Sequence, residues 1–304
     1  MGNVLSTNGL SKQYKRQMAV DHVNMNIDRG DIYGFVGENG SGKTTVIRMI
    51  TGLIFPCAGS FRLFGVSNDS GEIGQARRRI GAIVESPSIY MNLSAYENLK
   101  TQCAILGLEE GDKIRAVLHD VGLGELYDDK KHASNFSLGM RQRLGIAMAL
   151  LGDPEFLILD EPMNGLDPAG IVGIRELILK LNRERGITFL ISSHILTELS
   201  LVATKYGIIS KGKLIQEITA EQLHNQCAKT TAICTDEPEK LAEVVRGCVD
   251  NRLELTPDSV KILGVIDLNA VLSAILANGI RITGINCSET SFEDYYLSVI
   301  GGAR

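Results

Sequence analysis

The sequence predicts an α/β fold in which buried parallel strands alternate with helices, and three observations lead to this prediction. A short apolar run at residues 32–36 precedes a glycine-rich loop and a helical pattern. Two more runs rich in apolar residues, 156–159 and 187–193, are each followed directly by polar or charged side chains. Short apolar runs of this kind are typical of parallel strands covered on both faces. We therefore expect one sheet with its polar loops at the carboxyl ends of the strands.

The glycine-rich loop is the most informative segment of the chain. Residues 37–44 match the pattern GxxxxGKT between a predicted strand and a predicted helix. In that context the backbone N–H groups of the loop and the helix N-terminus surround a phosphate group. Lys43 is then expected to reach the β- and γ-phosphates of a nucleotide, and the Thr44 hydroxyl to ligate Mg²⁺. The expected nucleotide-contacting residues of this segment are Gly37, Asn39, Gly40, Ser41, Gly42, Lys43, Thr44 and Thr45.

Acidic side chains follow the second apolar run. Because Asp160 and Glu161 come directly after residues 156–159, they are placed at the carboxyl end of a buried strand, facing the ligand. Asp160 is expected to hold Mg²⁺ through water, and Glu161 to accept a proton from the water that attacks the γ-phosphate. His194 follows the third run at the same edge, where its imidazole is expected to contact the γ-phosphate. A solvated turn and a structural histidine are the alternatives, and the strand-end positions favour the functional interpretation.

A second anion site is indicated between these strands. Residues 137–143 open the amphipathic run 144–151. Ser137 as a helix N-cap, followed closely by Gly139, leaves backbone N–H groups exposed at a helix start. The segment is therefore expected to contact a phosphate group.

The phosphate loop, the segment 137–143, the strand ending in Asp160 and the strand before His194 follow one another along the chain. In this order they resemble the motifs of ATP-binding-cassette (ABC) ATPases, the cytosolic motor subunits of ABC transporters, and the resemblance covers residues 1 to about 215. The resemblance implies a P-loop NTPase cassette that binds ATP and Mg²⁺ and hydrolyses ATP. It makes residues 37–44 the Walker A loop and 156–160 Walker B. It also makes Glu161 the catalytic base and His194 the switch histidine.

Two further positions resemble nucleotide contacts of the family. Tyr14 matches the aromatic residue that stacks on adenine, although an edge-strand position would also suit a tyrosine. Asp167 ends the segment 164–167, which is similar to the family's D-loop.

The resemblance also implies a head-to-tail dimer. In such a dimer Ser137 and Gly139 of one cassette contact the γ-phosphate held by Lys43 of the other. The segment departs from the family's usual Leu-Ser-Gly-Gly-Gln at positions 136, 138 and 140, and the pair that faces the phosphate is kept. The second cassette is either another copy of this chain or a chain of different sequence.

Glu85 is the most informative departure from the family pattern. The family normally has glutamine after this strand, 80–84, and an ionised glutamate can only accept hydrogen bonds. Glu85 is expected to act in catalysis and as a metal contact, with its charge either neutralised by Mg²⁺ or balanced by protonation of a nearby carboxylate. A near-isosteric exchange with little consequence is the alternative. The surrounding sequence is similar to cassettes of lantibiotic-immunity and bacitracin-resistance exporters, so Glu85→Gln is expected to keep ATP binding and appreciable hydrolysis but to alter coupling to transport.

Composition limits the partners. The net charge of −5 and the absence of a long basic run make nucleic acid a poor candidate. The six cysteines form no CxxC pair and are expected to be free thiols of a cytosolic protein. No apolar segment approaches the roughly 20 residues needed to span a bilayer. Since the resemblance implies part of a transporter, separate permease subunits are expected, with this chain at the inner face of the cell membrane.

The two remaining parts of the chain carry no catalytic motif. Residues 86–136 are predicted to be a helical subdomain, with a capping box at Ser94 and Glu97 starting a helix that Gly107 ends. The apolar segment 87–91 is the expected docking surface for a permease, with ordinary packing as the alternative. Residues 216–304 are predicted to form a small α+β appendage with the order βαββαβ and a terminal helix.

Three functions compete at this point. The favoured one is the ATPase subunit of an exporter for a peptide antibiotic, such as a lantibiotic or bacitracin-like peptide, or a related drug. The second is a soluble ABC-class ATPase that acts on ribosomes or DNA; it is disfavoured because the chain has one cassette and no long coiled coil. The third is a nucleotide sensor without activity, against which Glu161 argues because a binding module needs no base.

Overall fold

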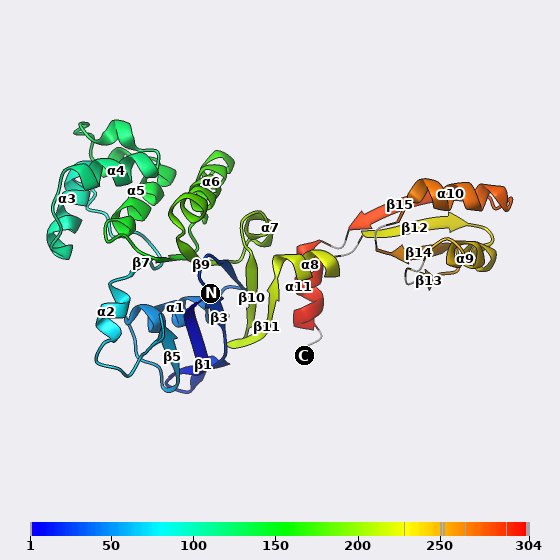
Figure 1. The fold of residues 1–304 in the computed structure, drawn as a ribbon, viewed down its shortest axis with the longest axis horizontal. Coiled ribbons are helices and arrows are strands. Elements are labelled where there is room, and N and C mark those ends of the chain that lie inside the picture. The colour runs from blue at the N-terminus through cyan, green and yellow to red at the C-terminus, as the bar shows by residue number, and fades with distance from the viewer. Residues whose placement is uncertain are drawn as a thin grey trace. The chain divides into compact units, whose positions relative to one another are not determined.

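The computed structural model describes residues 2–227, 229–249, 251, 253–264, 266–289 and 291–301. The chain divides into two compact units, Met1–Ala220 and Glu221–Arg304 (Figure 1). The boundary expected at residue 215 falls inside β11 (Lys213–Thr219), which pairs antiparallel with β10 (Lys205–Ser210) and so belongs to the first unit.

A six-stranded sheet forms the centre of the first unit and confirms the predicted α/β fold. Its order is β11-β10-β4-β9-β8-β7, and all neighbours except β10 and β11 run parallel. The remaining strands are β4 (Ile32–Val36), β7 (Ile80–Ile83), β8 (Phe156–Asp160) and β9 (Thr188–Ser193). Every residue of β4, β8 and β9 is buried, as expected for central strands covered on both faces.

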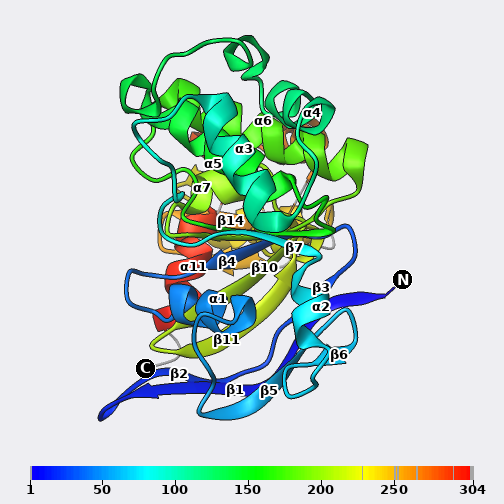
Figure 2. The same ribbon diagram turned by 90° about the vertical axis from the view of Figure 1, so that its left-hand side faces the viewer.

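Helix α1 (Lys43–Thr51) lies between this sheet and a second, antiparallel sheet, as Figure 2 shows. The sequence interpretation did not anticipate the second sheet. It contains β1 (Asn3–Tyr14), β2 (Gln17–Val23), β3 (Asn26–Asp28), β5 (Ala58–Leu63) and β6 (Val66–Ser67). One apolar core joins side chains of both sheets to Val46, Ile47 and Ile50 of α1, which fixes the helix in place.

The insert after β7 is helical, as predicted. It contains α3 (Ala95–Leu106), α4 (Asp112–Asp120) and two short 3₁₀ turns, Gly124–Leu126 and Ala133–Asn135, and α2 (Ile73–Arg77) precedes β7. The capping box is confirmed, since Ser94 Oγ accepts from the Glu97 amide and the Glu97 carboxylate accepts from the Ser94 amide. Helices α5 (Leu138–Leu150), α6 (Pro168–Arg185) and α7 (Leu196–Ser200) complete the unit.

The second unit has the predicted βαββαβ order. Its four strands form an antiparallel sheet in the order β13-β14-β12-β15, and an apolar core containing Ile233, Leu241 and Val271 joins the sheet to the helices at 238–246 and 268–277. The elements are α8 (Ala220–Gln226), β12 (Lys229–Thr235), α9 (Pro238–Arg246), β13 (Leu253–Leu255), β14 (Ser259–Leu263), α10 (Leu268–Ala277), β15 (Ile282–Glu289) and α11 (Phe292–Gly301). Among the described residues, no helix combines the length and apolar character that crossing a membrane requires.

Candidate nucleotide site

In the loop between β4 and α1, the backbone leaves room only for glycine at two positions. A Cβ atom on Gly37 would lie 2.4 Å from the Ile209 carbonyl oxygen. Gly42 has φ = +111°, and a Cβ there would lie 2.6 Å from the Ala19 carbonyl oxygen. The loop therefore closes tightly and presents its N–H groups at the start of α1, which has no side-chain cap.

Ser41 carries a polar atom that is not satisfied within the described protein. Its side chain is 5% exposed, and its Oγ has no hydrogen-bond partner among the described residues. Buried hydroxyls without a partner are uncommon in folded proteins. Together with the uncapped helix, the hydroxyl forms a set of donors that fits a phosphate group.

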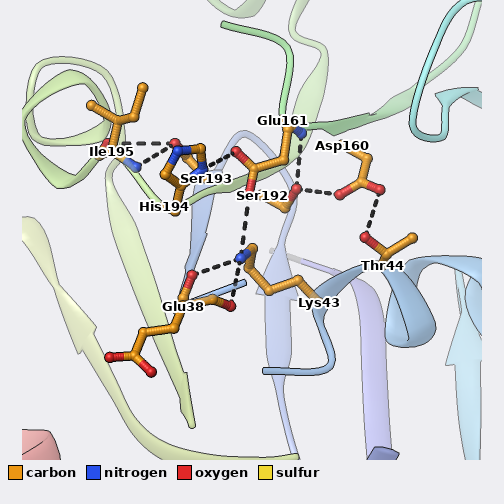
Figure 3. A network of polar contacts seen from close by, with 10 residues as sticks. Glu38, Lys43, Thr44, Asp160, Glu161, Ser192, Ser193, His194 and Ile195 are labelled. Carbon is orange, nitrogen blue, oxygen red and sulfur yellow. Dashed lines mark hydrogen bonds and ion pairs between the residues drawn. The ribbon is translucent and has the colours of Figure 1, made fainter. Parts of the chain in front are cut away.

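Lys43 is buried at the centre of the site, with 5% of its side chain exposed. Its Nζ donates to the carbonyl oxygens of Gly37 at 2.6 Å and Glu38 at 3.2 Å, and lies 3.3 Å from Glu161 Oε1 (Figure 3). The ammonium group is thus held where the loop ends, with one carboxylate to balance its charge.

Asp160, at the end of β8, is 2% exposed and accepts two hydroxyl hydrogen bonds. Thr44 Oγ1 donates to one carboxylate oxygen at 2.8 Å, and Ser192 Oγ donates to the other at 2.5 Å. Ser192 was not anticipated from the sequence. It lies opposite Asp160 in the parallel register of β8 and β9, so a correct pairing of those strands would have identified it.

Glu161 has a left-handed backbone, with φ = +50°, directly after β8. Its amide donates to Ser192 Oγ at 2.9 Å, which holds the turn. Its second carboxylate oxygen lies 2.7 Å from His194 Nδ1, so the carboxylate stands between His194 and Lys43 (Figure 3). The structure therefore brings together five of the predicted side chains, from the start of α1 and from the carboxyl ends of β8 and β9.

Of these groups, Lys43, Thr44 and Glu161 line a cavity of about 410 Å³, and Asp160 and His194 lie behind its lining. Its lining includes the loop residues 39–45 and Glu161, together with residues that the sequence interpretation missed: Gln17, Met18, Ala19, Lys211 and Gly212. The turn at 211–212 is anchored to the loop, because the Gly212 amide donates to the Ser41 carbonyl oxygen at 2.9 Å. Sequence spacing carries no signal for this contact between distant segments.

The remaining predicted contacts lie outside this cavity's lining. Tyr14 is 43% exposed at the end of β1, where it pairs with Gln17 across the β1–β2 turn. Ser137 is the N-cap of α5, as predicted, and accepts from the Met140 amide at 3.2 Å. Asp167 is the N-cap of α6, so the segments around Ser137 and Asp167 each start a helix.

Glu85 is engaged by a residue that the sequence interpretation did not consider. Arg48 Nη2 lies 2.5 Å from Glu85 Oε1, and the Glu85 side chain is 61% exposed. Arg48 therefore places a positive charge beside the Glu85 carboxylate, and the metal contact and catalytic role expected of Glu85 stay predictions.

The fold and this site define an ATP-binding cassette ATPase. Residues 20–164 match the family described as ABC transporter. The chain belongs to the family of ABC transporter ATP-binding proteins, and as a member it is an ATPase that binds ATP.

Three relatives show to which members of this family the chain is similar. The bacitracin transport ATP-binding protein BcrA of Bacillus licheniformis is 43% identical over 305 residues, covering 99% of both chains. The lantibiotic transport ATP-binding protein SrtF of Streptococcus pyogenes is 44% identical over 214 residues, covering 70% of this chain and 90% of its own. An uncharacterized ABC transporter ATP-binding protein of Bacillus subtilis (strain 168) is 39% identical and covers 99% of this chain and 98% of its own.

Solved structures agree with the fold of the first unit. The protein cbiO1 of Clostridium perfringens, part of the ABC transporter complex cbiONQ, matches with a TM-score of 0.66 at 27% identity, covering 73% of this chain and 91% of that one. A dimeric ATP-binding cassette bound to ADP and Pi matches with a TM-score of 0.63 at 25% identity, covering 71% of this chain and 98% of that one.

Proposed function

We propose that the protein is the ATP-hydrolysing subunit of a membrane exporter for bacitracin-like peptide antibiotics. The observation that carries this proposal is the extent of the match to the bacitracin transport proteins of Bacillus licheniformis and Enterococcus faecalis. Each match covers 99% of this chain and therefore includes the second unit, whereas the lantibiotic transport match covers 70%. A bacitracin-like peptide is the favoured cargo, and a lantibiotic is the alternative within the same class of transporter.

The geometry of the cavity supports ATP hydrolysis by the predicted residues. The unpartnered Ser41 hydroxyl, the closed glycine loop and the uncapped α1 fit the phosphates of ATP. When ATP binds, the Lys43 ammonium group would leave Glu161 and contact the β- and γ-phosphates instead. Glu161 would then accept the proton of the attacking water, with His194 holding its other oxygen.

Thr44 and Asp160 are the residues we propose to hold Mg²⁺. Their oxygens are 2.8 Å apart, and hydroxyl and carboxylate oxygens are the ligands that Mg²⁺ prefers. When bound, the ion would neutralise phosphate charge during hydrolysis. Glu85 remains a proposed third contact of the ion, and Arg48 balances part of the charge of its carboxylate.

A second cassette would complete the site. Ser137, Gly139 and Asp167 lie at helix starts outside the cavity, so we propose that they contact the nucleotide of a partner cassette. Tyr14 lies next to the cavity-lining hairpin residue Gln17, and we propose that it stacks on adenine. The partner is either a second copy of this chain or a different cassette.

A groove of about 920 Å³ is the proposed docking place of the permease. It is lined by β7, α5 and the end of α3, and includes Pro87 and Ser88 of the predicted docking segment. Its lining includes Leu53 and Ile105, which are 64% and 67% exposed, and also Arg77 and Arg78. We propose that a short amphipathic helix of a membrane subunit with an acidic side chain fills it, which would hold the protein at the cytoplasmic face of the membrane.

The test uses the variant Glu161→Gln as a trap. Expressed in its source cell and solubilised in mild detergent with Mg-ATP, this chain should bind nucleotide without turnover and co-purify with one or two polytopic membrane proteins. A deletion strain carrying the wild-type chain should resist bacitracin better than one carrying Lys43→Ala.

Two other outcomes would bear separately on the proposed cargo and on the proposed role in a transporter. Resistance restored only against a lantibiotic would replace the cargo and keep the transporter. Recovery of ribosomes or DNA-associated proteins without a membrane partner would overturn the transporter itself.

A further inference from the structure

Lys211 directly follows strand β10 at the edge of the sheet that carries the nucleotide cavity. Strand β10 runs parallel to β4, so its carboxyl end lies at the same edge as the phosphate loop (Figure 2). Glu161 and His194 occupy the same position after β8 and β9. Lys211 is therefore placed in the structure as these two site residues are.

Backbone contacts hold the turn after β10 against the phosphate loop. The Gly212 amide donates to the Ser41 carbonyl oxygen at 2.9 Å, and the Gly212 carbonyl oxygen accepts from the Asp21 amide at 2.8 Å. A Cβ atom on Gly212 would lie 2.9 Å from the Ala19 carbonyl oxygen, so glycine is needed for this close approach. The backbone of Lys211 therefore has a fixed position relative to the phosphate loop.

The turn itself does not account for a lysine at this position. It has two residues between β10 and β11, and both have positive φ, +48° for Lys211 and +81° for Gly212. Two-residue hairpin turns of this kind favour asparagine, aspartate or glycine at the first position. A lysine in such a conformation is uncommon, and residues of this kind cluster at ligand sites.

The lining of the cavity has one more positive charge than its own residues balance. Its charged residues are Lys43, Glu161 and Lys211, and Lys43 lies 3.3 Å from Glu161. The Lys211 side chain is exposed, and its ammonium group has no hydrogen-bond or ion-pair partner among the described residues. The cavity therefore offers an unpaired cation beside a loop that fits phosphate groups.

We infer that Lys211 is a further nucleotide-contacting residue, and that its ammonium group binds the α- and β-phosphates of ATP and ADP. The order of the strands selects these phosphates. Strand β10 lies on one side of β4, whereas β9 and β8, which precede His194 and Glu161, lie on the other. The γ-phosphate belongs to the side of Glu161, because the attacking water must reach both.

A contact with phosphates that are not transferred acts on binding rather than on the chemical step. Such a contact is equally strong before and during hydrolysis, so it lowers KM and leaves kcat unchanged. Because the Lys211 side chain is exposed, its charge is screened by water and salt, and the contact is weaker than one in a buried site.

The experiment measures dissociation constants of the purified full-length chain for ADP and for a non-hydrolysable ATP analogue, both with Mg²⁺. Lys211→Gln should weaken the binding of both nucleotides by the same factor, about three- to tenfold. Lys211→Arg should stay within about twofold of the wild type, because it keeps the charge. Raising the salt concentration should reduce the difference between Lys211→Gln and the wild type, since salt screens exposed charges.

Lys213→Gln is the matched control. Lys213 lies in the same hairpin, but it pairs with Asp21 at 3.3 Å and is not part of the cavity lining, so its variant should bind both nucleotides like the wild type. Without nucleotide, Lys211→Gln should unfold at the same temperature as the wild type. Unchanged affinity in Lys211→Gln, or an equal loss in Lys213→Gln, would overturn the inference. A loss confined to the ATP analogue would also overturn it, because Lys211 would then contact the γ-phosphate.

The role of Lys211 rests on the proposed use of the cavity by the phosphates of ATP, and Lys43→Ala tests that use separately. If Lys43→Ala weakens binding of the analogue and Lys211→Gln does not, the nucleotide site stands and only the role of Lys211 is wrong. If neither variant changes the affinity, the placement of the phosphates in this cavity is wrong as well.

Discussion

The close approach of Gly145 to Pro87 gives a sharp test of how the groove is built. Gly145 is buried in the middle of α5. A Cβ there would lie 2.4 Å from Pro87 Cβ, 3.0 Å from Pro87 Cγ and 3.4 Å from Ile83 Cδ1. Carbon atoms pack best at about 3.5–4.0 Å, so Gly145→Ala must displace the proline by roughly 1 Å.

Two opposing effects set the size of the change. Overpacking of this kind costs about 1–3 kcal/mol, because the proline ring is rigid and cannot turn aside. Alanine in a helix interior recovers about 1 kcal/mol relative to glycine. We therefore expect Gly145→Ala to lower the stability of α5 by about 1 kcal/mol. Gly74→Ala is the control, because Gly74 is helical and nothing lies within 4 Å of its Cβ position; it is expected to gain up to about 1 kcal/mol.

Native-state hydrogen exchange in increasing urea measures the opening free energy of α5 separately from the second unit. The reasoning predicts that the amides of α5 open more easily in Gly145→Ala than in the wild type. It also predicts faster exchange at 84–88, since the displaced proline disturbs the turn at Glu85, whose φ is +66° and which the hydrogen bond from the Ser86 amide to the Val84 carbonyl oxygen closes. If Gly145→Ala stabilises α5 as much as Gly74→Ala stabilises α2, then the contact with Pro87 is not tight and the argument from geometry is wrong.

Three further predictions concern the site and the pH response. Lys43→Ala should weaken ATP binding about 10- to 100-fold, measured by equilibrium titration, because charged hydrogen bonds to phosphate are lost; unchanged affinity would contradict its role. Glu161→Gln should lower kcat about 10²- to 10⁴-fold while ATP still binds, and near-normal turnover would remove Glu161 as the base. Hydrogen bonding and charge from Arg79 and Arg29 lower the pKa of Glu155 from 4.5 to about 2. Since the Glu155 side chain is 36% exposed, we expect Glu155→Gln to lower the free energy of unfolding by about 1 kcal/mol at pH 7. Denaturation curves should show this difference from the wild type shrinking as the pH falls from 4.5 towards 2. A difference that does not vary with pH would refute its ionic origin.

Short sequence patterns predicted much of the fold, because the interactions that produce each element involve only a few neighbouring residues. The capping box at Ser94 and Glu97 and the left-handed Gly107 that ends α3 need only one helical turn to operate. The same holds for the fully buried strands β4 and β8, because the run of apolar residues in each of them predicts burial on both faces.

The antiparallel sheet of the first unit was missed because its signal is interrupted. Strand β1 has irregular register between Leu10 and Lys12 where it meets β2, and Gly9 has φ = +59°. A bulge shifts the alternation of buried and exposed side chains, so a period of two does not persist along the strand. Strand β5, which pairs with β1, lies beyond the phosphate loop and α1 in the sequence.

The contacts of the site likewise divide into those that the sequence could predict and those that depend on the order of the strands. Polar residues that follow apolar runs could be predicted to meet at one edge of the sheet, because parallel strands end together. The partner of Glu85 could not, because Arg48 becomes a candidate only once β7 is known to lie beside β8. The helical insert separates those two strands in the sequence, and an insert of that length fits many strand orders. The contact of Arg48 with Glu85 is thus a consequence of sheet order, and reasoning from the residues alone could consider only Mg²⁺ or a proton as the balancing charge.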